Sequence, residues 1–182
     1  MRIITGTARG KRLITVAGGD LVRPTPEKVK EAIFSSIQFD IEGRRILDLF
    51  AGCGQLGIEA LSRKAESAVF VDASDISINT VRKNLNGTDF EAKAKLVRAD
   101  YSAFLTRCTD KFDIAFLDPP YNAGILQKAL ADVAEHMSDF GIIICEHPKD
   151  VTLDDTVKDF ALYREYRFGK IIVSVYKKRG QD

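Results

Sequence analysis

The stretch D-L-F-A-G-C-G-Q-L-G-I-E-A-L, residues 48–61, contains the pattern that decides the fold. Gly52, Gly54 and Gly57 satisfy G-x-G-x-x-G, directly after the apolar run I-L-D-L-F (46–50) and ahead of residues with helical spacing. Glycines suit such a turn because the chain bends tightly and its backbone must approach a ligand without an intervening Cβ atom. The order of strand, glycine-rich turn and helix predicts the ligand-binding corner of an open α/β sheet.

Strand and helix patterns alternate from residue 45 onward. Short apolar runs, typical of parallel strands covered on both faces, predict strands at 46–50, 68–72, 95–100, 113–118 and 141–146. Helical spacing predicts helices at 56–63, 75–85, 101–106 and 124–137. The runs 160–168 and 171–176, joined at Gly169-Lys170, predict an antiparallel hairpin. The pattern therefore indicates a doubly wound, mixed sheet with a reversed strand near its C-terminal edge.

A smaller unit precedes this alternation. The runs 2–6 and 12–16, with a turn between them, predict a hairpin-like arm. A helix is expected to begin at Thr25, because threonine is a good N-cap and Pro26 suits the first helical position.

Length and composition exclude several classes of protein. A chain of 182 residues, 45% hydrophobic and 29% charged, predicts one compact globular domain rather than disorder. No apolar run approaches the roughly 18 residues that cross a bilayer, and the N-terminus lacks a signal-peptide pattern. The three cysteines, Cys53, Cys108 and Cys145, form no C-x-x-C pair. We therefore expect a cytoplasmic protein without a disulfide framework or a metal site.

The net charge of +1 conceals a segregation of charge along the chain. Residues 1–30 hold 7 Lys/Arg and 2 Asp/Glu, and residues 163–182 hold 6 and 2. Residues 31–162 hold 14 Lys/Arg and 22 Asp/Glu. An acidic body with basic ends is compatible with a polyanionic partner, although solvated charged faces are common.

Asp48, just ahead of the glycines, bears on which ligand the turn binds. Glycine turns of this kind serve both dinucleotides and S-adenosylmethionine (SAM). A carboxylate so close to the turn would repel a pyrophosphate, whereas it would attract an ammonium group beside a sulfonium. Asp48 therefore favours SAM.

Further aspartates stand at the ends of the next strands. Asp72 can accept hydrogen bonds from ribose hydroxyls, and Asp100 from the adenine amine, with Tyr101 against the ring. Either aspartate alone is more simply explained as the N-cap of the helix that follows it. Because Asp48, Asp72, Asp100 and Asp118 each lie at or near the end of successive predicted strands, we expect all four to converge on one crevice.

The tetrapeptide Asp118-Pro119-Pro120-Tyr121 ends the fourth strand. Two prolines have fixed φ angles and no N–H, so the turn is stiff and leaves carbonyl groups unpaired. An Asp carboxylate beside a proline carbonyl forms a two-acceptor clamp for a planar amine, and Tyr121 offers a face on which a base can stack. Such a clamp would position an aromatic amine and stabilise the positive charge formed as it accepts a methyl group.

Three other residues with reactive side chains are interpreted as structural. Cys53 lies in the glycine turn without a neighbouring base, and a packing role is expected. Glu146 and His147 end the fifth strand close to the expected crevice, where a satisfied structural role is favoured.

Taken together, these residues resemble the RsmD family of ribosomal RNA guanine-N2 methyltransferases. The resemblance covers nearly the whole chain. It is carried by R-I-I-T-G-T-A-R-G-K-R-L (2–13), R-P-T-P-E-K-V-K-E-A-I-F (23–34), D-L-F-A-G-C-G-Q-L-G-I-E-A-L-S-R (48–63) and D-P-P-Y (118–121). It departs from the family pattern at Cys53, where Ser or Thr is usual, at Gln55, where a small residue is usual, and at Asp72, where Glu is usual.

The resemblance implies a class I SAM-dependent methyltransferase fold with a seven-stranded mixed sheet and helices on both faces. Residues 1–40 would form an N-terminal extension, a basic hairpin arm and helix that contacts RNA, and residues 41–182 the methyltransferase domain. The expected cofactor-binding residues are Asp48, Phe50, Ala51, Gly52, Gly54, Gly57, Asp72, Ala73, Asp100 and Tyr101. The expected catalytic residues are Asp118, Pro119, Pro120 and Tyr121. The expected RNA-binding residues are Arg2, Arg9, Lys11, Arg12 and Arg23, with Lys177, Lys178 and Arg179 as further candidates.

The resemblance also implies a reaction. A monomer would transfer the SAM methyl group to N2 of a guanine in small-subunit (16S) ribosomal RNA, of the guanine-966 type, on partly assembled subunits. Adenine-N6 methylation of DNA or RNA remains an alternative, since the same clamp fits adenine. A nicotinamide-dependent oxidoreductase and a non-catalytic nucleic-acid-binding module are more distant alternatives. The oxidoreductase alternative leaves Asp48 and D-P-P-Y unexplained.

Overall fold

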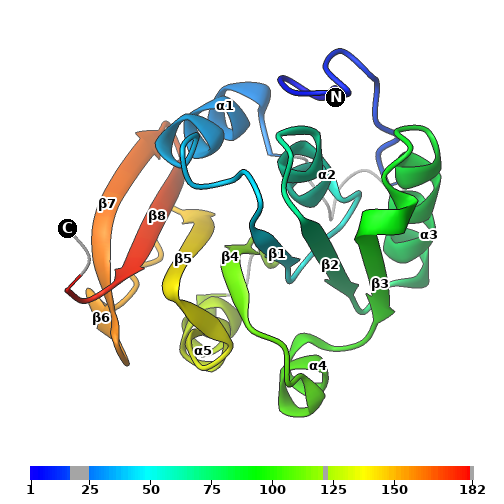
Figure 1. The fold of residues 1–182 in the computed structure, drawn as a ribbon. Helices are drawn as coiled ribbons and strands as arrows, with labels where there is room; N and C mark the ends of the chain where they lie inside the picture. The colour runs from blue at the N-terminus through cyan, green and yellow to red at the C-terminus, as the bar shows by residue number, and fades with distance from the viewer. Residues whose placement is uncertain (17–24, 121–122, 181–182) are drawn as a thin grey trace.

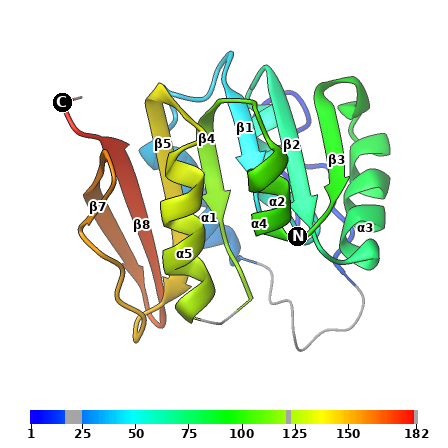
Figure 2. The same ribbon diagram turned by 90° about the horizontal axis from the view of Figure 1, so that it is seen from below.

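The computed structural model describes residues 1–16, 25–120 and 123–180. Its centre is an eight-stranded sheet in the order β3-β2-β1-β4-β5-β8-β7-β6 (Figures 1 and 2). Five strands are parallel, and four of them lie within two residues of the predicted runs, while the fifth has 12 residues and extends beyond the predicted 141–146 at both ends. They are β1 (Arg45–Asp48), β2 (Ser67–Asp72), β3 (Ala94–Arg98), β4 (Phe112–Leu117) and β5 (Met137–Pro148).

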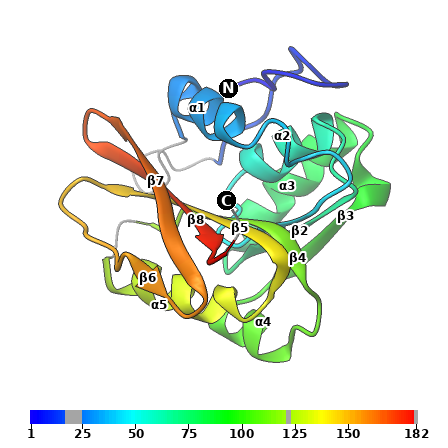
Figure 3. The ribbon, with the colours of Figure 1, turned by 60° about the vertical axis from the view of Figure 1, so that its left-hand side comes forward.

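The antiparallel part of the sheet lies beyond β5. β8 (Ile171–Lys178) is inserted between β5 and β7 (Phe160–Phe168) and pairs antiparallel with both, which confirms the predicted reversed strand (Figure 3). β6 (Thr156–Val157) adds an eighth strand at the edge of the sheet, where seven were expected. Two residues carry too little alternation for a sequence pattern to reveal a strand.

Helices cover both faces of the sheet, which makes three layers (Figure 1). One face carries α1 (Glu27–Ser36), α2 (Gln55–Ser62) and α3 (Asp75–Asn86), and the other carries α4 (Tyr101–Arg107) and α5 (Ala123–Ala134). A short 3₁₀ helix, Glu91–Lys93, precedes β3. Because each strand alternates its side chains, a separate apolar cluster lies on each face. No helix of the described residues is long and apolar enough to cross a membrane.

Two predicted helix boundaries are wrong. The last helix was expected to reach residue 137, but α5 ends at Ala134 because Met137 already pairs with Phe112 in the sheet. α1 has Pro26, not Thr25, at its N-cap position, and no side chain caps it. The Thr25 hydroxyl instead donates to Asp118 Oδ2, 3.3 Å away.

The N-terminal segment folds back on itself, with a single antiparallel bridge between Arg2 and Arg12. Ile3, Ala8 and Leu13 from this segment are buried in the apolar cluster that also contains α1 and α2. The segment is thus in direct contact with the helices of the main sheet, while its assignment to a separate unit over residues 1–40 stays a prediction.

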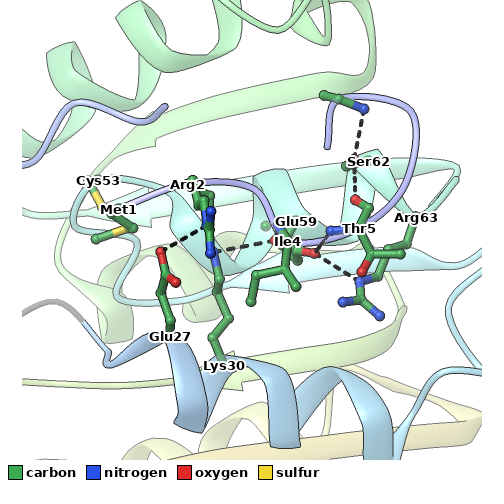
Figure 4. A network of polar contacts seen from close by, with 12 residues as sticks. Met1, Arg2, Ile4, Thr5, Glu27, Lys30, Cys53, Glu59, Ser62 and Arg63 are labelled. Atoms are coloured by element: carbon green, nitrogen blue, oxygen red, sulfur yellow. Dashed lines mark hydrogen bonds and ion pairs between the residues drawn. The ribbon is translucent and has the colours of Figure 1, made fainter. Parts of the chain in front are cut away.

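A buried carboxylate on α2 holds this segment in place (Figure 4). Glu59 is fully buried, and its two oxygens accept hydrogen bonds from the backbone N–H groups of Ile4, at 2.8 Å, and Thr5, at 3.0 Å. The fully buried Lys30 of α1 lies 3.3 Å from Glu59, and Arg63 lies 3.0 Å away. Glu59 therefore joins the N-terminal segment, α1 and α2 through one side chain.

Ser62, one turn further along α2, adds contacts to the same segment. Its hydroxyl donates to the Thr5 carbonyl at 2.6 Å and accepts from the Ala8 N–H at 3.0 Å. Gly6 has φ +91°, and a Cβ atom there would lie 1.9 Å from the Ser62 carbonyl oxygen. Only glycine permits this close approach of the two backbones.

Candidate active site

A cavity of about 460 Å³ lies at the carboxyl ends of the parallel strands, where open α/β sheets bind their ligands. Six of the predicted cofactor-binding residues line it: Phe50, Gly52, Asp72, Ala73, Asp100 and Tyr101. Three of the predicted catalytic residues line it as well: Asp118, Pro119 and Pro120. Tyr121, the fourth, lies outside the described residues. The structure thus brings the glycine turn and the D-P-P turn to one cavity.

A smaller cavity of about 50 Å³ lies directly beside the first, and the two share the lining residues Val16, Phe50, Gly52 and Asp118. Asp48 and Ala51, two further predicted cofactor-binding residues, line it. So does Gln55, whose Oε1 is buried without a hydrogen-bond partner among the described residues. A buried amide oxygen in this position needs a donor.

The glycines of the turn have different roles. The Gly52 N–H donates to Asp72 Oδ2 at 2.9 Å, which ties the turn to the end of β2. Gly54 has φ +78° and stands at the N-cap of α2. A Cβ atom on Gly57 would lie 2.3 Å from the Phe70 ring, so Gly57 allows α2 to pack on β2. Gly54 and Gly57 are not among the described residues that line either cavity.

Asp48 is buried, with 3% of its surface exposed. Its Oδ2 accepts a hydrogen bond from the Gly57 N–H at 3.0 Å. Burial raises the pKa of Asp48 to about 7; the hydrogen bond from Gly57 opposes this shift and the nearby Asp72 adds to it. A cationic ligand beside Asp48 would favour the ionised form.

The carboxylates of Asp72 and Asp100 already accept hydrogen bonds within the chain. Asp72 Oδ1 accepts from the Ser74 N–H at 2.8 Å, in addition to the Gly52 contact of its Oδ2. Asp100 Oδ1 accepts from the Ser102 N–H and hydroxyl and caps α4, and these bonds lower the pKa of Asp100. Asp100 is thus the N-cap of α4, as the simpler explanation of a strand-end aspartate predicts, and it also lines the cavity.

An aromatic pair lines the same cavity as these aspartates. The rings of Phe50 and Tyr101 have centroids 5.4 Å apart and an interplanar angle of 47°. Both rings line the larger cavity and are only partly buried. They provide an apolar wall suited to a flat heterocycle.

Asp118 is the acidic centre of the site. Its Oδ2 accepts the hydrogen bond from Thr25, and its side chain lines both cavities. Burial, together with the carboxyl groups of Glu146 and Asp48, raises the pKa of Asp118 well above its usual range, and the Thr25 hydrogen bond opposes this shift.

The position of Glu146 beside Asp118 follows from the register of the sheet. Leu117 pairs with Cys145, so Asp118 and Glu146 leave neighbouring strands side by side and point to the same face. Glu146 is 8% exposed, and its Oε2 is buried without a hydrogen-bond partner among the described residues. Glu146 was expected to have a structural role with its hydrogen-bonding groups satisfied, and that expectation is wrong for this oxygen. His147, by contrast, contacts Ser174 Oγ at 2.9 Å.

The predicted RNA-binding residues are exposed where they are described. Arg2, Arg9, Lys11 and Arg12 all have exposed side chains, and Arg23 lies outside the described residues. Arg2 lies 3.5 Å from Glu27, and Lys11 lies 3.4 Å from Asp89. Solvent-exposed pairs of this kind are weak enough to exchange for phosphate contacts.

The C-terminal basic residues lie elsewhere. β8 runs antiparallel to β5, so that Lys177 pairs with Ile142 and Lys178 lies 2.7 Å from Asp139, both in the first half of β5. Lys177, Lys178 and Arg179 therefore lie toward the amino ends of the parallel strands, whereas the cavity lies at their carboxyl ends. The structure does not bring them together with the site.

Sequence reasoning missed several residues of the site. Thr25 and Glu146 contribute to the surroundings of Asp118, while Val16 and Gln55 line the cavities. Only the position of Glu146 at a strand end, beside Asp118, carried a signal. The described residues contain no group of three or more His, Cys, Asp or Glu side chains that could hold a metal ion.

Comparison with known proteins defines the class first. A solved structure of the Escherichia coli protein yhhF superimposes with a TM-score of 0.85 and 30% identity, covering 100% of this chain and 99% of that one. The T. thermophilus 16S rRNA methyltransferase RsmC, solved in complex with AdoMet and guanosine, has a TM-score of 0.72 at 23% identity, over 90% of this chain and 45% of that one. The fold is that of the class I SAM-dependent methyltransferases, as predicted.

Sequence comparison then gives the family. The family described as Conserved hypothetical protein 95 matches residues 1–177. The Bacillus subtilis protein named "Putative rRNA methyltransferase YlbH" is 41% identical over 99% of this chain and 100% of its own length. Escherichia coli ribosomal RNA small subunit methyltransferase D is 30% identical over 100% of this chain and 91% of its own. The chain belongs to this family, the RsmD family that its motifs resemble.

Proposed function

We propose that this protein is a SAM-dependent methyltransferase that acts on ribosomal RNA. The observation that supports the proposal is the shared cavity, because residues of the glycine turn and the D-P-P carboxylate both line it. The relatives named for rRNA methylation span the same length of chain, which supports RNA as the substrate.

The residues of the site fit SAM. The unpartnered Gln55 Oε1 and the buried Asp48 carboxylate both face the smaller cavity, where an ammonium group would supply the missing donors. Asp72 retains lone pairs for ribose hydroxyls, and Phe50 and Tyr101 offer apolar faces to adenine. A pyrophosphate, the alternative ligand of a glycine turn, would meet the carboxylates of Asp48 and Asp118.

When bound, SAM supplies an electrophilic methyl group. The chain's own contribution begins with Asp118 and Pro119, whose carboxylate and carbonyl would accept the two hydrogens of the target amine and fix its orientation. Asp118 is partly removed from water, which strengthens these hydrogen bonds because the local dielectric is lowered. The same carboxylate would stabilise the positive charge that develops on the amine nitrogen.

The finer proposal is that the amine is N2 of a guanine in 16S rRNA, of the guanine-966 type, and that the target base is flipped out of its stack to reach Asp118. The motifs that resemble the RsmD family support this choice over adenine N6. Arg2, Arg9, Lys11, Arg12 and Arg23 would hold the phosphate backbone, and residues 1–40 would form the RNA-contacting unit. Tyr121 would stack on the flipped base.

Few basic side chains make few phosphate contacts, so specificity would depend on RNA shape and on ribosomal proteins already in place. We therefore propose partly assembled small subunits as the substrate and a monomer as the active form.

The test is a radiolabelled methyl-transfer assay. Naked 16S rRNA, partly assembled small subunits and duplex DNA are incubated with the protein and labelled SAM, followed by digestion and nucleoside analysis. Labelled N2-methylguanosine, strongest with the assembled particle, is expected. Labelled N6-methyladenosine would contradict the target assignment, and absence of label with every substrate would contradict the enzyme assignment.

Two binding measurements complete the test. Calorimetry is expected to show binding of SAM and not of NADH; the reverse result would favour the oxidoreductase. Asp118→Ala is expected to abolish transfer while SAM affinity stays within about tenfold, roughly 1.4 kcal/mol. Equal loss of both would mean that Asp118 serves the cofactor instead of the amine.

A further inference from the structure

Glu146 has no role in the proposed function, although it is among the least satisfied groups of the site. Its Oε2 is buried without a partner, on the side of Asp118 away from Asp48. Burying an ionisable oxygen in this way is costly unless a proton or a ligand compensates. The arrangement therefore calls for a proton on the Asp118–Glu146 pair or a donor brought by a ligand.

The Thr25 hydroxyl interacts with both carboxyl groups. It donates to Asp118 Oδ2 at 3.3 Å, and it lowers the pKa of Glu146, against the larger raising effect of burial. A hydroxyl has one hydrogen and two lone pairs, so it can donate to one carboxylate while accepting from the other when that one is protonated. Thr25 can therefore stabilise either protonation state of the Asp118–Glu146 pair.

No described cation offsets this cluster. Asp118 is faced by Glu146 from β5, by Asp48 from β1 and by Thr25 from the segment before α1. Among the described residues, no lysine or arginine forms an ion pair with any of the three carboxyl groups. Two carboxyl groups that lie close together favour a state in which one proton is shared.

We propose that Glu146 and Thr25 are positioning residues that make Asp118 the proton acceptor of the methyl transfer. The proposal rests on the proposed function. As the C–N bond forms between the target amine and the methyl carbon, the C–S bond breaks and its electron pair goes to sulfur, giving S-adenosylhomocysteine. The amine nitrogen, now positively charged, loses its proton to the Asp118 carboxylate, so atoms and charges balance. Glu146 favours that transfer because a neighbouring negative charge raises the affinity of Asp118 for the proton.

The two positioning residues have opposite effects on the pKa of Asp118. Glu146 raises it, and the hydrogen bond from Thr25 lowers it. Glu146→Gln should therefore move the acidic limb of the rate profile to lower pH, and Thr25→Val should move it to higher pH. Each shift is expected to be about one pH unit, equivalent to about a tenfold change in rate below the limb.

The experiment is a single-turnover measurement of methyl transfer between pH 5 and 9, with SAM saturating and the RNA substrate identified by the assay above. Single turnovers isolate the chemical step from product release. Asp113→Asn is the matched control, since Asp113 is a buried carboxylate of β4 at the opposite end of the strand, paired with Arg45. Its acidic limb should coincide with that of the unmodified protein, even if its stability is lower.

Opposite shifts in the two variants would support the proposal. A merely structural role would lower the amplitude of both profiles and leave the limbs in place, which would overturn it. If Glu146→Gln fails to bind SAM, the shift in Thr25→Val decides the question. Absence of transfer by the unmodified protein on every RNA would instead refute the proposed function, and the proton-acceptor role with it.

Discussion

Replacing Glu59 by alanine should detach the N-terminal segment and destabilise the whole fold. The substitution removes the acceptor of two backbone N–H groups, those of Ile4 and Thr5, and the partner of Lys30. Both Glu59 and Lys30 have fully buried side chains, 0% exposed, so the lysine is left without its counterion in the interior.

The magnitude follows from that burial. Removing one partner of a buried ion pair costs about 3–5 kcal/mol. The two N–H groups add little beyond this, because a detached segment exposes them to water. For a domain of this size each kcal/mol lowers Tm by about 2–4 °C, so Glu59→Ala should melt roughly 6–20 °C below the unmodified protein. Lys30 limits the loss in part, since burial already lowers its pKa and the lone amine can release its proton.

Urea denaturation followed by circular dichroism measures the free energy of unfolding, and hydrogen exchange at the amides of Ile4 and Thr5 reports on the segment itself. The control is Glu42→Ala, because Glu42 and Lys64 form a pair whose side chains are 73% and 64% exposed. That pair should contribute less than about 1 kcal/mol. If Glu59→Ala were no more destabilising than Glu42→Ala, apolar contacts alone would hold the segment and our reasoning would be wrong.

Three other outcomes are expected. Gly57→Ala should cost about 1–3 kcal/mol in urea denaturation, because its Cβ would lie 2.3 Å from Phe70, whereas Gly87→Ala, with its nearest atom at 3.6 Å, should be nearly neutral. Tyr101→Ala should weaken SAM binding by about 1–3 kcal/mol in calorimetry if its ring stacks on adenine, and unchanged affinity would remove it from the site. Without SAM, the protein should lose stability as pH rises from about 4 to 7, because folded Asp48 (pKa about 7) holds a proton that unfolded Asp48 (pKa 3.8) has released. Asp48→Asn should abolish this pH-dependent contribution of roughly 4 kcal/mol to the free energy of unfolding. If the free energy of unfolding of Asp48→Asn kept the same dependence on pH, the burial of Asp48 would be contradicted.

Local pattern was enough to predict most of the fold. The glycine turn, the strand-end aspartates and the reversed final strand all follow from runs of fewer than ten residues, since period and turn chemistry are local properties. The convergence of Asp72, Asp100 and Asp118 on one cavity followed from the parallel sheet, whose carboxyl ends share one edge.

Pairings across the chain could not be predicted in this way. Glu59 and Lys30 look like ordinary charged residues of solvated helices, yet each is buried because the other is present. Thr25 was assigned to the helix beside it, but its partner Asp118 stands 93 positions away. Sequence spacing carries no information on such contacts, because they depend on how the layers come together.

The order in which the strands are made differs from their order in the sheet. β8 is synthesised after β7, but it lies between β5 and β7, so β6 and β7 have no edge to join until β8 has left the ribosome. Until then β5 presents an open apolar edge that includes Ile143 and Ile144, a template for pairing with other chains. The antiparallel end of the sheet is therefore the part of this protein most exposed to misassembly during its synthesis. That exposure ends when β8 pairs with β5 on one side and β7 on the other.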